Sequence, residues 1–254
     1  RSRQVTGVQT CALPILGERA GVALPQTSMS EEDRKERGIR DRLLEINKIA
    51  ATYYYRQLRS ENGKAGLDYL KKRELSDSTI NSFGLGYATQ STGNLYKLLK
   101  DKGYDDDILK ESGLFTYERG IHEKFWNRVI FPIMDINNKV IGFGGRVMGD
   151  AKPKYLNSPE TRLFDKSRNL YGLNIARTSR KPNMIICEGY MDVISMHQAG
   201  FNQAVASLGT ALTPGHARLL KRYTDNVLIT YDSDEAGVKA ALRAIPILKE
   251  AGLS

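Results

Sequence analysis

Apolar residues recur at helical spacing early in the chain and gather into short runs near its end. Between residues 30 and 60 the apolar positions fit one long amphipathic helix, and they are Leu43, Ile46, Ala50, Tyr53 and Leu58. Ser30, followed by Glu31 and Glu32, predicts the N-cap of this helix. Shorter helices are expected around "AGLDYLKKR", "SDSTINSFG" and "GNLYKLLKDKG".

The apolar period then changes to one that favours strands. The stretch "RVIFPIMDINNKVIGFGGRVM" contains two β-rich runs joined by Asn137–Asn138, which predicts a hairpin. Glycines 142, 144 and 145 lie within the second run, and no helix follows them. They are therefore a weak match to a dinucleotide-binding loop.

After Pro182 short apolar runs alternate with helical patterns. The runs "NMIIC", "QAVASL" and "NVLITY" are typical of buried strands in a parallel sheet. Between them lie "MDVISMHQAG" and "TPGHARLLKRY", the second opened by Thr213 as N-cap and Pro214 at the first helical position. The last helix is expected to pack on the sheet through one apolar face made of Val238, Ala241, Leu242, Ile245 and Leu248. The predicted fold class is α/β, with a mixed α+β subdomain ahead of a parallel sheet flanked by helices.

Two of these apolar runs end in acidic residues. Glu188 follows "MIIC", and Asp232 and Asp234 follow "LITY". Parallel strands present their carboxyl ends at one edge of the sheet, so these carboxylates should converge there, with Asp232 and Asp234 on the same side if the segment stays extended. Their mutual repulsion would be relieved by Mg²⁺ or Mn²⁺, which prefer oxygen ligands.

Helix capping is the alternative explanation for some of these acids. A carboxylate at a helix N-terminus is stabilised by about 0.3–1 kcal/mol, and Asp192, Asp234 and Glu235 each precede or open a predicted helix. Two acidic turns in register favour the metal site over capping alone. Asp192 is the position at which both interpretations stay most open.

Charge is distributed unevenly along the 254 residues, which carry a formal net charge of +9. Residues 118–181 contain 13 basic and six acidic residues, whereas residues 182–254 contain six basic and seven acidic ones. A basic segment ahead of clustered acids suggests a polyanionic partner, and a solvated basic surface is the alternative. Two cysteines and three histidines argue against a disulfide framework and a structural zinc site, and no apolar run is long enough to span a membrane.

Two groups of motifs resemble known families. "EGYMD" and "YDSDEAG" resemble the acidic turns of the Toprim domain. The runs "RVIFPI", "VIGFGGRV", "PKYLNSPET", "FDKSRNLYGL" and "ASLGTALT" resemble the RNA-polymerase core of a bacterial DnaG-type primase. The resemblance covers roughly residues 16–254.

The resemblance implies a DNA primase that makes short RNA primers on single-stranded DNA by metal-dependent nucleotidyl transfer from ribonucleoside triphosphates. Glu188, Asp232 and Asp234 would be its catalytic and metal-binding residues, with Asp192 as a further candidate. Four residues match family positions for nucleotide or nucleic-acid binding, namely Arg146, Lys154, Asn157 and Lys166. Mg²⁺ or Mn²⁺ is the expected cofactor, and no zinc is expected in this part of the family's sequence.

The resemblance also divides the chain. Residues 1–15 are expected to be a non-native leader, residues 16–181 the basic subdomain of the primase core, and residues 182–254 a Toprim domain truncated before its third acidic turn. The family's zinc-binding module and the domain that docks on the replicative helicase are expected outside this chain. The expected location is the bacterial cytoplasm.

Other functions use the same acidic motifs. A Toprim nuclease or topoisomerase fragment would cleave DNA phosphodiesters, and a catalytically inactive Toprim domain would only bind phosphate. An assay with single-stranded DNA, ribonucleotides and magnesium separates them, because new RNA, cut DNA or neither would be found.

Overall fold

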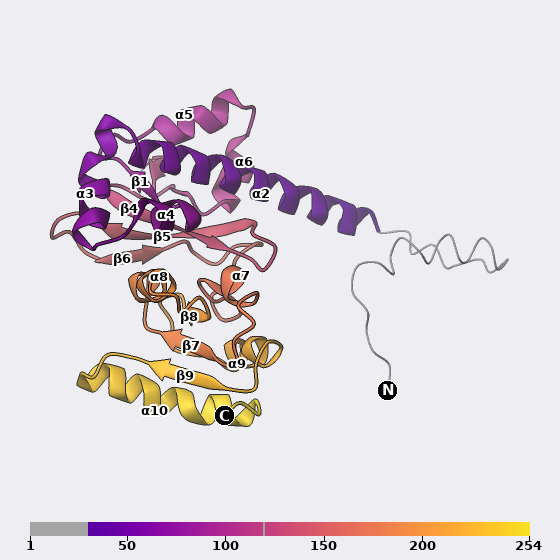
Figure 1. Ribbon diagram of the computed structural model, residues 1–254. Coiled ribbons are helices and arrows are strands. Elements are labelled where there is room, and N and C mark those ends of the chain that lie inside the picture. Colours follow the sequence, from indigo (N-terminus) through magenta and orange to yellow (C-terminus); the bar gives the residue numbers. More distant parts are fainter. Residues whose placement is uncertain (1–29, 119) are drawn as a thin grey trace, which may run out of the picture. The chain divides into compact units, whose positions relative to one another are not determined.

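The computed structural model describes residues 30–118 and 120–254 (Figure 1). Two compact units divide between Gly38 and Ile39. In the first, the backbone N–H of Asp33 donates to Ser30 Oγ at 3.0 Å, which confirms the predicted N-cap. The expected leader, residues 1–15, lies outside the described residues.

Short helices and strands alternate along most of the chain. The helical elements are α2 (Glu31–Leu58), η1 (Glu61–Gly63), α3 (Lys64–Lys72), α4 (Asp77–Ser82), α5 (Asn94–Asp101), α6 (Asp106–Glu111), α7 (Leu173–Ala176), α8 (Tyr190–Gln198), α9 (Pro214–Lys221) and α10 (Glu235–Glu250). The strands are β1 (Gly86–Ala88), β2 (Phe115–Thr116), β3 (His122–Glu123), β4 (Arg128–Met134), β5 (Val140–Val147), β6 (Tyr155–Asn157), β7 (Met184–Cys187), β8 (Ala204–Ala206) and β9 (Val227–Thr230).

The buried face of α2 follows the predicted helical spacing with one change. Leu43, Ile46, Ala50 and Leu58 are buried as expected. The buried aromatic residue is Tyr54 rather than Tyr53, which is only half-buried. The ring of Tyr54 packs edge-on against the rings of Phe125 and Phe143, which lie beneath the helix. Tertiary aromatic contacts therefore select between two adjacent tyrosines that sequence spacing could not separate.

Strands β1, β4, β5 and β6 form an antiparallel sheet in the order β1-β4-β5-β6. The predicted hairpin is confirmed, because β4 pairs with β5 through a turn in which Asn138 has a φ of 62°. Asp135 Oδ1 accepts hydrogen bonds from the backbone N–H groups of Asn137 and Lys139 and holds this turn. Asparagine tolerates the left-handed conformation better than most residues.

The glycine-rich end of the hairpin serves packing. Gly144 lies in β5, where a Cβ atom would come within 2.4 Å of the Tyr190 ring. The absence of a side chain lets the start of α8 approach the antiparallel sheet directly. The three glycines at positions 142, 144 and 145 therefore belong to strand β5. They do not form a dinucleotide-binding loop, as the weakness of the sequence match indicated.

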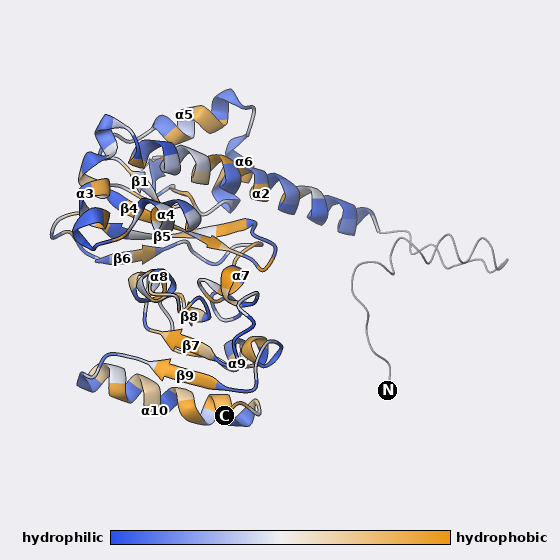
Figure 2. Cartoon of the chain, viewed as in Figure 1, coloured by the Kyte–Doolittle hydropathy of each residue, from blue (hydrophilic) through white to orange (hydrophobic). Residues whose placement is uncertain are grey.

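The last third of the chain forms a parallel sheet in the order β8-β7-β9, flanked by helices, as the sequence predicts. Figure 2 shows strands β7 and β9 in hydrophobic colours. The central strand β7 is buried throughout, but burial alternates along β9 and Leu228 is 52% exposed. The prediction of complete burial is therefore wrong for β9, because it lies at the end of the strand order with one face less covered.

The predicted packing face of the last helix is wrong for three of its five residues. In α10, Val238, Leu242 and Ile245 are exposed, with Leu242 at 63%. Leu248 is buried as predicted and Ala241 is half-buried, while Gly237 and Ala244, which lie outside the predicted face, are buried as well. An apolar stripe offers more than one orientation, and the helix packs through the face that carries Gly237, Ala244 and Leu248.

The two sheets share a hydrophobic core within residues 39–254. Val129 and Phe131 of β4 belong to the same buried cluster as Ile185 of β7 and Val193 of α8. Burial of apolar surface of this kind is the main force that would hold the two sheets together. No helix in the described part of the chain is long and apolar enough to cross a membrane.

Candidate functional site

The three strands of the parallel sheet end in register. Cys187 of β7 pairs with Ala206 of β8 and with Thr230 of β9. The residues that follow these strand ends therefore lie along one edge of the sheet, and Glu188 is the one after the central strand. This is the carboxyl edge, where ligands bind in open α/β sheets.

A groove of about 480 Å³ runs along this edge, and we call it the edge groove. Its walls come from both sheets, and it is lined by Arg73, Lys154, Tyr155, Asn157, Glu188, Gly189, Tyr190, Met191, Asp192, Ser207, Gly209 and Asp232. Five of the residues singled out in the sequence meet here: Lys154, Asn157, Glu188, Asp192 and Asp232. Basic and acidic side chains from separate parts of the sequence thus line one cavity.

The carboxylate of Glu188 contacts the turn that contains Asp232. Glu188 Oε1 accepts a hydrogen bond from the backbone N–H of Asp232 at 3.2 Å. Partial burial raises the pKa of Glu188, and the charges of Asp232, Asp234 and Asp192 add to this, while the hydrogen bond acts against it. Glu188 and Asp232, two of the three acids expected at the sheet edge, therefore lie together there.

Asp192 combines the two roles that the sequence left open. Its Oδ2 accepts a hydrogen bond from the backbone N–H of Gly189 at 3.0 Å, so it caps the start of α8. It also lines the edge groove. Burial raises the pKa of Asp192, the charge of Asp232 raises it further, and the charge of Arg73 lowers it.

Asp234 is turned toward α10. Its Oδ1 accepts a hydrogen bond from the backbone N–H of Gly237 at 2.8 Å, which makes Asp234 the N-cap. The condition that the segment stays extended is not met, because β9 ends at Thr230 and Asp234 does not line the edge groove. Within residues 30–118 and 120–254, no three His, Cys, Asp or Glu side chains are gathered in a metal-binding cluster.

The chemistry of these side chains nevertheless suits a hard divalent cation. Glu188 and Asp232 offer carboxylate oxygens, and the charge of Asp232 makes ionisation of Glu188 less favourable. A divalent ion bound between them would remove this repulsion. Rotation of Asp192 away from Gly189 would add a further carboxylate from the same groove. The residues thus fit such an ion in donor type.

Gly237 allows the Asp232 turn to close. A Cβ atom at this position would lie 2.1 Å from the backbone oxygen of Asp232 and 2.9 Å from Glu188 Oε1. Contacts this short do not occur between real atoms, so only glycine fits. The glycine of "DEAG" is therefore part of the acidic site, a role that the sequence analysis did not assign.

Lys154 lines the same groove as the carboxylates and supplies positive charge to it, and its segment is held by a buried arginine. Arg128, which is 6% exposed, donates from Nη1 to the carbonyl oxygens of Gly145 and Pro153 at 3.2 and 3.0 Å. Arg73, which follows α3, adds a second cation to the groove. Neither Arg73 nor Arg128 was found from the sequence, because each acts across a long sequence separation.

Arg146 lies beside the groove and packs on an aromatic ring. Its guanidinium carbon is 4.3 Å from the centre of the Tyr69 ring, and Nη1 donates to the carbonyl oxygen of Val147 at 2.8 Å. It does not line the edge groove, but it pairs in the β-ladder with Tyr155, which does. A phosphate contact by Arg146 therefore stays a prediction.

Asn157 uses its amide group within the protein. Its Nδ2 donates to the carbonyl oxygen of Leu208 at 2.9 Å, and its Oδ1 accepts from the Tyr190 hydroxyl at 2.7 Å. These bonds tie β6 to α8 and to the segment after β8. A template contact by Asn157 stays a prediction, alongside this structural role.

Lys166 lies outside the edge groove, on a turn fixed to the start of α9. His216 is fully buried and bonds the carbonyl oxygen of Lys166 at 2.7 Å through Nε2, while its Nδ1 accepts from the backbone N–H of Thr213. The Thr213 hydroxyl donates to the carbonyl oxygen of Ser167 at 2.6 Å. Burial lowers the pKa of Lys124, and the charge of Lys166 lowers it further.

This arrangement predicts acid sensitivity. Burial lowers the pKa of His216 and of His197. Below about pH 6.5 the unfolded chain takes up protons that the folded chain does not, so stability falls by up to about 1.4 kcal/mol per pH unit for each histidine. We expect the free energy of unfolding, measured with denaturant between pH 5 and 8, to change less steeply with pH in His216→Gln than in the unchanged chain. The exposed His122→Gln variant is the control, and equal slopes for both variants would contradict the role of His216.

Tyr155 offers an aromatic surface to the groove. It is 38% exposed, and its ring stacks on that of Tyr190, which in turn stacks on Phe131 at 4.9 Å between ring centres. Burial raises the pKa of Tyr155 to about 12, so its hydroxyl stays protonated at neutral pH. Exposed rings next to cations suit the stacking of nucleic-acid bases.

Two protein-family models match the chain, each over a separate segment. Residues 185–254 match the family described as Toprim-like, and residues 53–177 match the DNA primase catalytic core, N-terminal domain. A DNA primase of Clostridium acetobutylicum is 51% identical over 214 residues, which are 84% of this chain and 36% of that protein. The chain belongs to the bacterial DnaG-type primase family.

Solved structures of this family share the fold. The DnaG primase catalytic domain bound to single-stranded DNA has a TM-score of 0.77 at 40% identity, covering 82% of this chain and 66% of that one. The RNA polymerase domain of Mycobacterium tuberculosis primase DnaG has a TM-score of 0.77 at 34% identity, covering 82% and 71%. The chain spans little more than a third of the Clostridium acetobutylicum relative's length.

Proposed function

We propose that this chain carries the template-binding and nucleotide-binding surface of a DNA primase and part of its catalytic centre. The observation that carries the proposal is the edge groove, in which Lys154 and Arg73 face Glu188, Asp192 and Asp232. Carboxylates alone would repel a nucleic-acid strand and a triphosphate. A groove with both charge types can hold phosphate groups on one wall and a divalent ion on the other.

The reaction is the joining of ribonucleotides on a single-stranded DNA template. The 3′-hydroxyl of the growing primer attacks the α-phosphate of the incoming ribonucleoside triphosphate, and pyrophosphate leaves. Mg²⁺ or Mn²⁺, when bound by Glu188 and Asp232, supplies stabilisation of the charge that develops on the reacting phosphate. Lys154 and Arg73 hold phosphate oxygens, and Tyr155 offers a ring on which a base stacks.

The remaining expectations extend this proposal. Asp234 would join the metal site after a change in its side-chain orientation, since its charge already reaches Glu188. We also propose that the core divides into two domains near residue 181. For the whole protein we propose a cytoplasmic location and a helicase partner. The DnaG structure bound to single-stranded DNA supports the template as the ligand of the groove.

The test measures primer synthesis by two proteins. One is the chain itself, and the other is the chain extended by the residues that follow the matched segment in the Clostridium acetobutylicum relative. Single-stranded DNA, labelled ribonucleotides and Mg²⁺ are supplied, and RNA and DNA products are separated on one gel. New RNA supports the primase. Cut DNA in place of RNA would support a Toprim nuclease, and no product with retained phosphate binding would support an inactive binding domain.

Lys154→Ala should weaken binding of single-stranded DNA and flatten its salt dependence. Loss of one phosphate contact should make the slope of log K against log salt less negative by about 0.7. Fluorescence anisotropy at several salt concentrations measures both. Lys102→Ala, at an exposed position after α5, is the control.

Arg146→Ala should act in the same direction but with a less direct interpretation, because it also removes the packing on Tyr69. If the Lys154 and Lys102 variants gave the same slope as the unchanged chain, the charge at Lys154 would be only solvated surface.

A further inference from the structure

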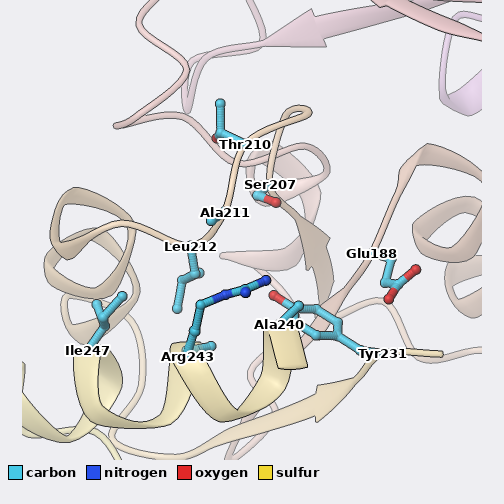
Figure 3. Close-up of a pocket in the computed structure, with 10 residues that line it drawn as sticks. Glu188, Ser207, Thr210, Ala211, Leu212, Tyr231, Ala240, Arg243 and Ile247 are labelled. Atoms are coloured by element: carbon cyan, nitrogen blue, oxygen red, sulfur yellow. The ribbon is translucent and has the colours of Figure 1, made fainter. Parts of the chain in front are cut away.

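A second cavity lies on the other side of Glu188. It measures about 390 Å³ and is bounded by the segment after β8 and by α10 (Figure 3). It shares Glu188 and Ser207 with the edge groove, whereas Thr210 and Arg243 line this cavity only. The two cavities therefore meet at the carboxylate after the central strand.

Arg243 is the cation of this cavity. Its side chain reaches from α10 across the cavity, in the direction of Tyr231 and Glu188 (Figure 3). Within the described residues it makes no ion pair or hydrogen bond, in contrast to Lys239 one turn earlier, which pairs with Glu235. Arg243 is exposed and lines the cavity together with apolar residues such as Leu212 and Ala244, so its guanidinium is accessible to an anionic partner and can bind two oxygens of a phosphate group at once.

Three hydroxyl groups surround the same space. Ser207, Thr210 and Tyr231 all line the cavity, and none of their side chains has a hydrogen-bond partner in the part of the chain that the structure describes. Ser207 and Tyr231 directly follow strands β8 and β9, which fixes their place at the sheet edge. A guanidinium and several hydroxyls are donors that match the oxygens of a phosphate group.

We propose that Arg243, with the hydroxyls of Ser207, Thr210 and Tyr231, forms a binding site for a polyphosphate group beside the acidic edge. The ligand is the triphosphate of a nucleotide or the pyrophosphate released from it. A volume of about 390 Å³ accommodates such a group together with part of a nucleoside over the apolar wall. This assignment deepens the proposed function, on which it rests for the identity of the ligand.

The proposal also places the leaving group. With Lys154 and Arg73 on one side of Glu188 and Arg243 on the other, a nucleotide can have its reacting phosphate at the carboxylates and its terminal phosphates at Arg243. Release of pyrophosphate would then leave the edge groove free for the primer and template. The two cavities would divide the substrate at the bond that breaks.

The test is calorimetric binding of inorganic pyrophosphate and of a ribonucleoside triphosphate to the chain with Mg²⁺. Arg243→Gln should weaken both by about tenfold to a hundredfold, because it removes a charge-assisted contact. Thr210→Val, which removes a hydroxyl at nearly constant volume, should weaken both by a smaller factor. Lys249→Gln is the control, since it makes the same change of charge on an exposed part of α10 away from the cavity.

The outcomes separate this proposal from the proposed function. Unchanged pyrophosphate and triphosphate affinity in Arg243→Gln, with the same thermal unfolding as the unchanged chain, would overturn the site even if primers are made. Loss of affinity in Arg243→Gln but not in Lys249→Gln supports it even if no primer is made. Loss for triphosphate alone would assign the site to the bound substrate, and loss for both to substrate and product.

Discussion

Asp232→Asn is expected to reduce primer synthesis by about a thousandfold or more and to weaken Mg²⁺ binding at least tenfold. The substitution keeps the shape of the side chain and the backbone N–H that donates to Glu188. It removes one of the carboxylates that line the edge groove, and with it much of the attraction for a divalent ion.

The same variant should be as stable as the unchanged chain, or more stable, in metal-free buffer. The charge of Asp232 contributes to the raised pKa of Glu188, so its removal relieves repulsion. Calorimetric Mg²⁺ titration and urea unfolding measure the two effects. Asp101→Asn, at the exposed end of α5, is the control. Equal Mg²⁺ affinity in the two variants would remove Asp232 from the site.

Gly237→Ala is expected to damage both the fold and the acidic site. Alanine favours a helix by about 1 kcal/mol over glycine, but its Cβ would lie 2.1 Å from the backbone oxygen of Asp232. That atom can retreat only if the whole turn moves, so a net loss of about 1–3 kcal/mol is expected. Displacement of the turn should also weaken Mg²⁺ binding, although no ligand has been removed.

Gly38→Ala is the matched control for this change. Gly38 lies in α2, and nothing lies within 4 Å of a Cβ atom built there. The same substitution should therefore stabilise the chain slightly through helix propensity and leave Mg²⁺ binding unchanged. Stabilisation of similar size by both substitutions would show that the Asp232 turn adapts without cost.

The sequence predicted the architecture well where local signals and tertiary packing agree. The hairpin at Asn137–Asn138 and the cap at Thr213 depend on a few neighbouring residues, and both are confirmed. The outward face of α10 and the exposure of Leu228 depend on which surface a neighbouring element covers. Periodicity cannot supply that information, because an apolar stripe does not specify its partner.

The site was predictable in its acids and less so in its surroundings. The parallel-sheet pattern predicts that Glu188 and Asp232 reach the same edge, and the register of β7 with β9 places them there. The contributions of Arg73 and Arg128 come from distant segments whose pairing no local pattern encodes. Asp234 shows the limit of the argument from strand geometry, because one hydrogen bond to Gly237 determines where its carboxylate points.

The hydrophobic core that joins the two sheets determines how the groove can move. Phe131 and Tyr190 stack within that core, and Tyr190 also bonds Asn157 at the groove wall. Widening the groove would separate these rings, so the basic and acidic walls should open only when much of the core opens. Amide hydrogens of β4, β5 and β7 should then exchange with solvent at similar rates, as one cooperative unit. The distance between the two charged walls is therefore fixed, and a nucleic-acid strand and a nucleotide must fit within it.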